Sequence, residues 1–147
     1  MLFRSVTLSI DDANSDDNFD PLSDQSVSVT TTDDDVAGFT VVESGGSTSV
    51  DESGTTDTFT VVLDAEPDSN VVITVVSGDT GEATVDQASL TFTSATWDTA
   101  QTVVVTGVDD DIIDGSQVTT VTLSIDDANS DDNFDPVSDQ KIGRAHV

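Results

Sequence analysis

The chain has 147 residues, with 30 acidic residues against three basic ones and no cysteine. Because the basic residues are Arg4, Lys141 and Arg144, the segment 6–140 carries a formal charge of −30. The negative electrostatic potential of such a segment repels nucleic acid and anionic membranes and attracts cations. The lack of cysteine excludes a disulfide framework, and no apolar stretch approaches the roughly 20 residues that span a bilayer. We therefore expect a fold that depends on counterions, with no nucleic-acid partner and no membrane insertion.

Both ends of the sequence resemble translated sequencing-library adapters. Residues 1–5 (MLFRS) match one adapter, and residues 141–147 (KIGRAHV) match the opposite one. Segments of this kind are set aside before the fold is considered. We therefore expect residues 6–140 to be the biological insert.

A long internal repeat is the most specific signal in the sequence. Residues 6–25 and 121–140 agree at 19 of 20 positions, at an offset of 115 residues, and only Leu22 and Val137 differ. A repeat of this length is one domain of a tandem array. Residues 6–35 are then the C-terminal part of one repeat, and residues 36–140 are the next repeat without its final strand. That strand should resemble residues 26–35, and neighbouring repeats should be the partners.

Six β-strands follow in chain order, each with apolar residues alternating with Thr or Ser between Gly, Pro and Asp breaks. The apolar positions expected to face inward are Phe39 and Val41; Phe59, Val61 and Leu63; Val71, Ile73 and Val75; Leu90 and Phe92; Val103 and Val105; and Val121, Leu123 and Ile125. No window has a helical period of useful length. The pattern predicts an all-β, immunoglobulin-like antiparallel sandwich of about seven strands whose last strand is truncated.

Three segments resemble the Calx-beta repeats of sodium/calcium exchangers and large bacterial surface proteins. Residues 106–114 (TGVDDDIID) are similar to the family's strand-to-loop acidic motif, and residues 32–43 (TDDDVAGFTVVE) to its inter-repeat junction and first strand. Residues 83–98 resemble a third segment, although Gln87 replaces the family's Tyr. The resemblance covers nearly all of residues 33–125, and the acidic junction is its most specific part.

The resemblance implies a set of calcium ligands at one end of the sandwich. They are Glu43, Asp86, Asp109, Asp110, Asp111 and Asp114, with a contribution from a terminal triplet of the kind formed by Asp33, Asp34 and Asp35. Calcium takes about six to eight oxygen ligands. Two carboxylates ~5 Å apart repel by about 3 kcal/mol at an effective dielectric of 20, so such a cluster favours a bound cation. The alternative is that these acids are solvated turn formers.

Two departures weaken the expected site. Gly115, Ser116 and Gln117 stand where the family has further acids, which implies fewer or weaker ions. In addition, residues 33–35 belong to the preceding repeat in this interpretation. We therefore expect that neither calcium site in the chain is complete.

The loop 126–136 (DDANSDDNFDP), with its copy at residues 11–21, superficially resembles an EF-hand loop. Counted from Asp127, however, the sixth position is Asp132 instead of Gly, and the twelfth is Ser138 instead of Glu. We expect a solvated hairpin loop pinned by Phe134, with a peripheral calcium site as the alternative.

Catalysis is not expected. Residues 6–140 contain no His, Cys, Lys or Tyr, which removes the familiar triads, Schiff bases and zinc sites. Paired carboxylates can hydrolyse glycosides, but Trp97 is the single large aromatic platform, and we expect it to cover the core.

The sequence therefore predicts a calcium-binding structural extender repeat of a secreted or cell-surface adhesin-type protein. Its partners are neighbouring repeats, and any cell-surface or glycan ligand is bound by other domains. A carbohydrate-binding module and a passive acidic spacer are the alternatives. Calcium dependence separates the extender from the spacer, and glycan binding that survives chelation favours the carbohydrate module.

Overall fold

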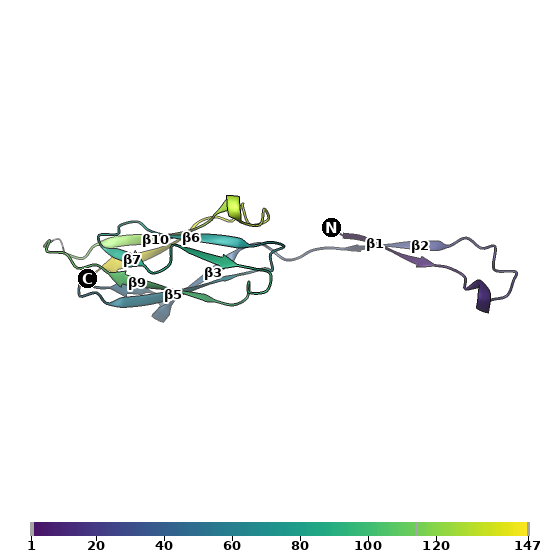
Figure 1. Cartoon of the computed structure of the whole chain (residues 1–147), viewed down its shortest axis with the longest axis horizontal. Coiled ribbons are helices and arrows are strands. Elements are labelled where there is room, and N and C mark those ends of the chain that lie inside the picture. The colour runs from purple at the N-terminus through teal and green to yellow at the C-terminus, as the bar shows by residue number, and fades with distance from the viewer. Residues whose placement is uncertain (1, 114, 147) are drawn as a thin grey trace. The chain divides into compact units, whose positions relative to one another are not determined.

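The computed structural model describes residues 2–113 and 115–146, with side chains for 4–113 and 115–143. It forms two units, Met1–Asp35 and Val36–Val147 (Figure 1). Strands dominate both units, and the described helices are single 3-10 turns. None of them has the length or apolar character needed to cross a membrane.

Unit 1 is one β-hairpin. Strands β1 (Leu2–Leu8) and β2 (Gln25–Thr31) pair antiparallel, and the turn η1 (Asp12–Asn14) lies in the loop between them. Every side chain of β2 is exposed, including Val27 and Val29, because nothing within the unit packs on either face of the hairpin.

Unit 2 is an immunoglobulin-like β-sandwich of two sheets, as the alternating pattern predicts. One sheet has the order β4-β11-β10-β6-β8, and the other has the order β3-β5-β9-β7. All pairs are antiparallel except β4 with β11, which is parallel. The strands are β3 (Phe39–Glu43), β4 (Thr48–Val50), β5 (Thr56–Leu63), β6 (Val71–Ser77), β7 (Ala83–Val85), β8 (Ser89–Phe92), β9 (Gln101–Gly107), β10 (Val118–Ile125) and β11 (Gln140–His146). The turns η2 (Ser44–Gly46) and η3 (Asp127–Asn129) complete the unit.

The core lies between the sheets and is built from the predicted inward positions. Phe59, Phe92 and Ile73 are among the largest fully buried side chains, and Val41 and Ile125 pack against the cluster while partly buried. Trp97 also packs against the core, as expected for a covering residue. Strand alternation therefore accounts for the packing of this unit.

The edge expected to be open beside β10 holds strand β11. Residues of β11 pair with β10 over Leu123↔Gln140 to Val118↔Ala145, and with β4 on the other side. Ile142 is 4% exposed. The segment 140–146 thus takes the place of the seventh strand, because an unpaired edge beside an apolar interface favours any strand that can satisfy its backbone groups.

The two hairpins have the same pairing register. Leu8 pairs with Gln25 as Leu123 pairs with Gln140, and Val6 pairs with Val27 as Val121 pairs with Ile142. Residues 3–8 and 25–30 of the first hairpin therefore have paired counterparts 115 positions later in β10–β11.

Candidate metal centre

Asp33, Asp34 and Asp35 form an acidic triplet at the end of unit 1. One carboxylate oxygen from each lies within 4.8 Å of the others, and all three side chains are exposed. The Asp35 N–H donates to Asp33 Oδ1 at 3.1 Å, which orders the turn. Among the side chains that the structure describes (4–113 and 115–143), this is the one group of three or more candidate metal ligands that meets so closely.

Asp109, Asp110 and Asp111 follow β9 at the end of the sandwich where β5 begins. The backbones of Gly107 and Asp51 pack closely at this end of the sandwich. A Cβ added at Gly107 would lie 2.1 Å from the backbone oxygen of Asp51, so only glycine fits there. Asp110 Oδ1 accepts the Ile112 N–H at 2.7 Å, which engages one of its oxygens in a local turn. Asp109 and Asp111 are exposed. Asp114, the last acid predicted here, lies outside the described residues.

Asp86 and Glu43 lie at opposite edges of the four-stranded sheet. Glu43 on β3 faces Phe59, which faces Val103 on β9. Asp86 follows β7, where its N–H donates to Val104 O at 3.0 Å and its Oδ1 accepts the Val104 N–H at 2.8 Å. Three strand spacings separate the two edges, on the order of 14 Å. The structure therefore does not bring these two predicted ligands together.

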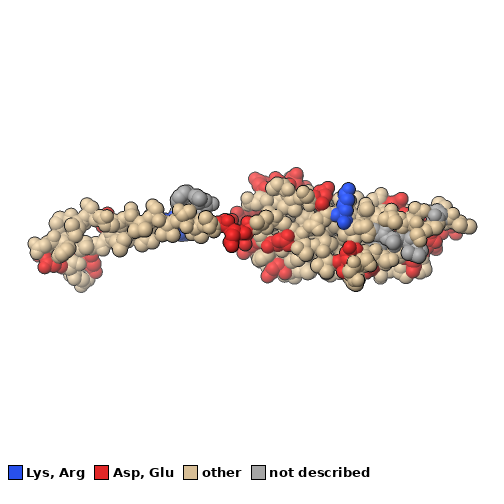
Figure 2. Space-filling view, turned by 180° about the vertical axis from the view of Figure 1, so that it is seen from behind, with Lys and Arg blue, Asp and Glu red and all other residues tan. Residues whose placement is uncertain are grey.

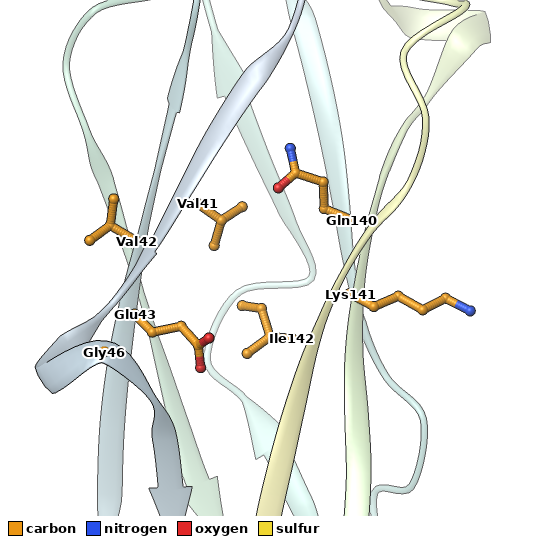
Figure 3. Close-up of a pocket in the computed structure, with 7 residues that line it drawn as sticks. All are labelled: Val41, Val42, Glu43, Gly46, Gln140, Lys141 and Ile142. Atoms are coloured by element: carbon orange, nitrogen blue, oxygen red, sulfur yellow. The ribbon is translucent and has the colours of Figure 1, made fainter.

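The Glu43 carboxylate lies in a pocket between β3 and β11. Figure 3 shows it directed toward Ile142, while the Lys141 side chain points away from the pocket. Thr48 Oγ1 donates to Glu43 Oε2 at 2.5 Å, and Gln140 Nε2 donates to the Phe39 carbonyl oxygen at the same distance. Both bonds join β3 to a strand of the other sheet, and the bond from Thr48 gives the Glu43 carboxylate a structural role in the sandwich.

Sequence reasoning missed the buried carboxylate of Asp131, which is 4% exposed. Its Oδ2 accepts the N–H groups of Asp68 and Ser69 at 2.8 and 2.9 Å. Its Oδ1 accepts the backbone and side-chain N–H groups of Asn133, both at 2.9 Å. These bonds, above all the one from the Asn133 backbone, hold the pKa of Asp131 below its usual value.

Asp131 therefore anchors the 126–136 loop. Phe134 is 2% exposed and packs in the core, which confirms that this residue pins the loop. The Asp-x-Asn spacing typical of a local side-chain turn is visible in the sequence, but the bonds to Asp68 and Ser69 join residues more than 60 positions apart.

The pKa of Asp135 is shifted in the opposite direction to that of Asp131. Loss of hydration next to the neighbouring atoms, followed by the charges of Asp127, Asp132 and Asp131, raises the pKa of this exposed carboxyl. Its surroundings thus disfavour a further negative charge. Figure 2 shows acidic side chains in several groups on the face of the molecule that it draws.

Comparison with solved structures defines the class of fold. Two structures of the surface-layer protein SbsC match with TM-scores of 0.51 and 0.50, at 22% and 23% identity. They cover 84% and 85% of this chain, which spans 15% of the longer SbsC chain and 52% of the fragment with domains 4 and 5. SSP-19, an MSP-domain protein of Caenorhabditis elegans, matches at 13% identity with a TM-score of 0.51, over 72% of this chain and 98% of its own.

These likenesses establish a sandwich fold shared with a surface-layer protein. The apo-form Calx CBD1 domain also matches at 12% identity, over 74% of this chain and 97% of its own, but its TM-score of 0.48 carries no argument. No protein-family model and no curated protein sequence matches the chain.

Proposed function

We propose that this chain is a calcium-binding structural repeat of a secreted or cell-surface, adhesin-type protein, with no catalytic role. The observation that carries the proposal is the triplet Asp33–Asp35, whose carboxylate oxygens converge within 4.8 Å immediately before the first residue of the sandwich. Like charges held this close favour a bound cation.

The chemistry of the ligands favours calcium over other metals. Residues 6–140 offer carboxylate, carbonyl, amide and hydroxyl oxygens but no His or Cys, so the preferred ligands of zinc and copper are missing. Calcium accepts flexible sets of about six to eight oxygens that include water and backbone carbonyls, whereas magnesium requires a near-ideal octahedron. The exposed triplet supplies three carboxylates of such a set, and solvent or the acids of a neighbouring repeat complete it.

The place of the triplet in the chain suggests its mechanical role. Calcium held by the last residues of one unit offsets the mutual repulsion of these three carboxylates and ties them to one ion. Binding then reduces the freedom of the connection between successive sandwiches and stiffens an array of repeats. The surface-layer protein among the fold neighbours supports a location at the cell surface.

Calcium titration of the full chain tests this function. Millimolar calcium should raise the melting temperature or reduce the range of particle dimensions in X-ray scattering, because a ligand specific to the ordered state stabilises that state. The triple variant Asp33→Asn, Asp34→Asn and Asp35→Asn should lose about tenfold or more in calcium affinity, by isothermal titration.

The matched control removes three exposed acids outside the triplet. The variant Asp24→Asn, Asp98→Asn and Asp139→Asn has the same change in charge and should retain calcium affinity. Equal losses of calcium affinity in the two variants would contradict the proposal. So would a sodium salt at equal ionic strength that reproduced the whole effect of calcium, because general screening of the acids would then explain it. Binding of a glycan that survives chelation would favour a carbohydrate-binding module instead.

A further inference from the structure

We propose that the unit 1 hairpin is an interaction surface whose partner is the sandwich of a second copy of this chain. In the complex, β1–β2 takes the place that β10–β11 occupies against residues 36–117. This inference is independent of calcium binding, because it rests on the match of residues 6–25 with 121–140 and on the register that the two hairpins share.

The first hairpin exposes a set of large apolar side chains. Val6, Leu8, Phe19, Leu22 and Val27 have between 53% and 57% of their surface exposed. A soluble surface seldom carries so many apolar side chains on one short element unless they meet a partner.

The second hairpin shows what covers these residues. Their counterparts Val121, Leu123, Phe134 and Ile142 are between 0% and 4% exposed, and Val137 packs against the same core. Because pairing within the two hairpins is the same, residues that share a face in β10–β11 also share a face in β1–β2. The surface that fits this face is therefore the inner side of the sandwich built by residues 36–117.

Polar groups of the hairpin match the same partner. In unit 2, Ser130 Oγ accepts the Val72 N–H at 2.9 Å, and Asp131 accepts the N–H groups of Asp68 and Ser69. The first hairpin carries Ser15 and Asp16 at the corresponding positions. Asp16 already accepts the backbone N–H of Asn18 at 2.9 Å, as Asp131 does with Asn133, so its other oxygen is directed by the same local turn.

The outer strand edges of the first hairpin also favour a second sandwich as its partner. The β10 strand pairs with β6, and β11 pairs with β4, so the hairpin bridges two strands of the sandwich. In unit 1, β1 and β2 are each paired on one side only, in a two-stranded sheet. Seating in a second sandwich satisfies both outer edges, which an unrelated apolar surface cannot do.

A pair of equivalent substitutions tests the exchange in the full chain. Leu123→Asp places a charge in the core and expels the chain's own C-terminal hairpin, which vacates the binding place. This variant should fold only as an oligomer, with a melting temperature that rises with protein concentration and with slow amide exchange in residues 5–31. Sedimentation at high ionic strength, where the acidic surfaces repel least, should show the association.

The second substitution tests whether the first hairpin is the element that enters the second sandwich. Adding Leu8→Asp, the equivalent change in unit 1, should abolish both the oligomer and the folding of Leu123→Asp. Adding Thr7→Asp instead should preserve them, because Thr7 lies on the opposite face of the same strand and adds the same charge. Leu8→Asp alone should leave the melting temperature of the wild-type sandwich unchanged, which shows that the substitution acts only on association.

Three results would overturn the inference. The first is Leu123→Asp remaining unfolded at every concentration, and the second is an oligomer that survives Leu8→Asp. The third is folding that does not depend on concentration, which would show that no second molecule is needed.

Discussion

The hairpins β1–β2 and β10–β11 place nearly the same twenty residues in two different surroundings. Pairing within each hairpin is identical, yet Phe19 is 54% exposed and Phe134 is 2% exposed. The local sequence is thus sufficient for the turn, the register and the alternation of faces. Burial, and with it most of the stabilisation, comes from the strands that lie outside the hairpin. The contribution of a residue can therefore be measured against an identical residue that lacks the sandwich.

The largest contrast is expected for the two phenylalanines. Phe134→Ala should lower the free energy of unfolding of unit 2 by about 3–5 kcal/mol, because it removes a large buried ring and leaves a cavity. Phe19→Ala should leave that value unchanged. Denaturant unfolding followed by Trp97 fluorescence measures both, since Trp97 packs against the core. Similar losses in the two variants would mean that the first hairpin is also buried in solution.

A smaller contrast is expected for the equivalent carboxylates of Asp131 and Asp16. Asp131→Asn replaces one accepting oxygen by an NH₂ group that meets N–H donors, so it should cost about 1–3 kcal/mol in the unfolding of unit 2. Asp16→Asn, the same change in unit 1, should cost nothing by that measurement. An unchanged midpoint for Asp131→Asn would show that water replaces the lost bonds.

The lowered pKa of Asp131 gives this contrast a pH dependence. A carboxyl whose pKa is lower in the folded state contributes stability that is fully present above its unfolded value, near 3.8. That contribution is lost as the pH falls through the lowered folded pKa. The difference in stability between wild type and Asp131→Asn should therefore be constant near neutral pH and shrink below about pH 4. A difference that grew on acidification would have the wrong sign for this assignment.

Asp135→Asn should produce the smallest effect, with the opposite sign. Since desolvation and neighbouring acids raise the pKa of the exposed Asp135, its charge disfavours the folded state at neutral pH. Removing the charge should raise the melting temperature slightly at pH 7, and the gain should fade as the pH falls through the raised folded pKa and the carboxyl of the wild type becomes protonated. A lower melting temperature at pH 7, measured by calorimetry, would show that the ionised group makes a favourable contact instead.

The sequence predicts the core well and the candidate site poorly, for physical reasons. Alternation has a period of two residues, so Val61, Ile73 and Val105 can be assigned to the inner face without knowing which strands are neighbours. A metal site depends on which strands are neighbours. Glu43 and Asp86 belong to strands at opposite edges of one sheet, and the order β3-β5-β9-β7 is a property of the whole packing.

Whether a residue's partners are near or far in the chain also decides what else the sequence could predict. Asp33–Asp35 converge because they are adjacent in the chain, so composition alone indicates them. The burial of Asp131 depends on Asp68 and Ser69, which no local pattern reveals. The repeat predicts that the last strand of the sandwich is truncated in this chain, but residues 140–146 pair in its place, because backbone pairing accepts many sequences once a strand lies in register.

The shared register of the two hairpins has a consequence for measuring local opening. Equivalent amides such as those of Leu8 and Leu123 have the same flanking residues, so in an unstructured chain they would exchange hydrogen at the same intrinsic rate. Resolved by NMR, the ratio of their observed rates gives the difference in opening free energy between the isolated and the packed hairpin, free of any reference peptide. The molecule thus contains an internal standard for the protection that a sandwich gives to its last hairpin.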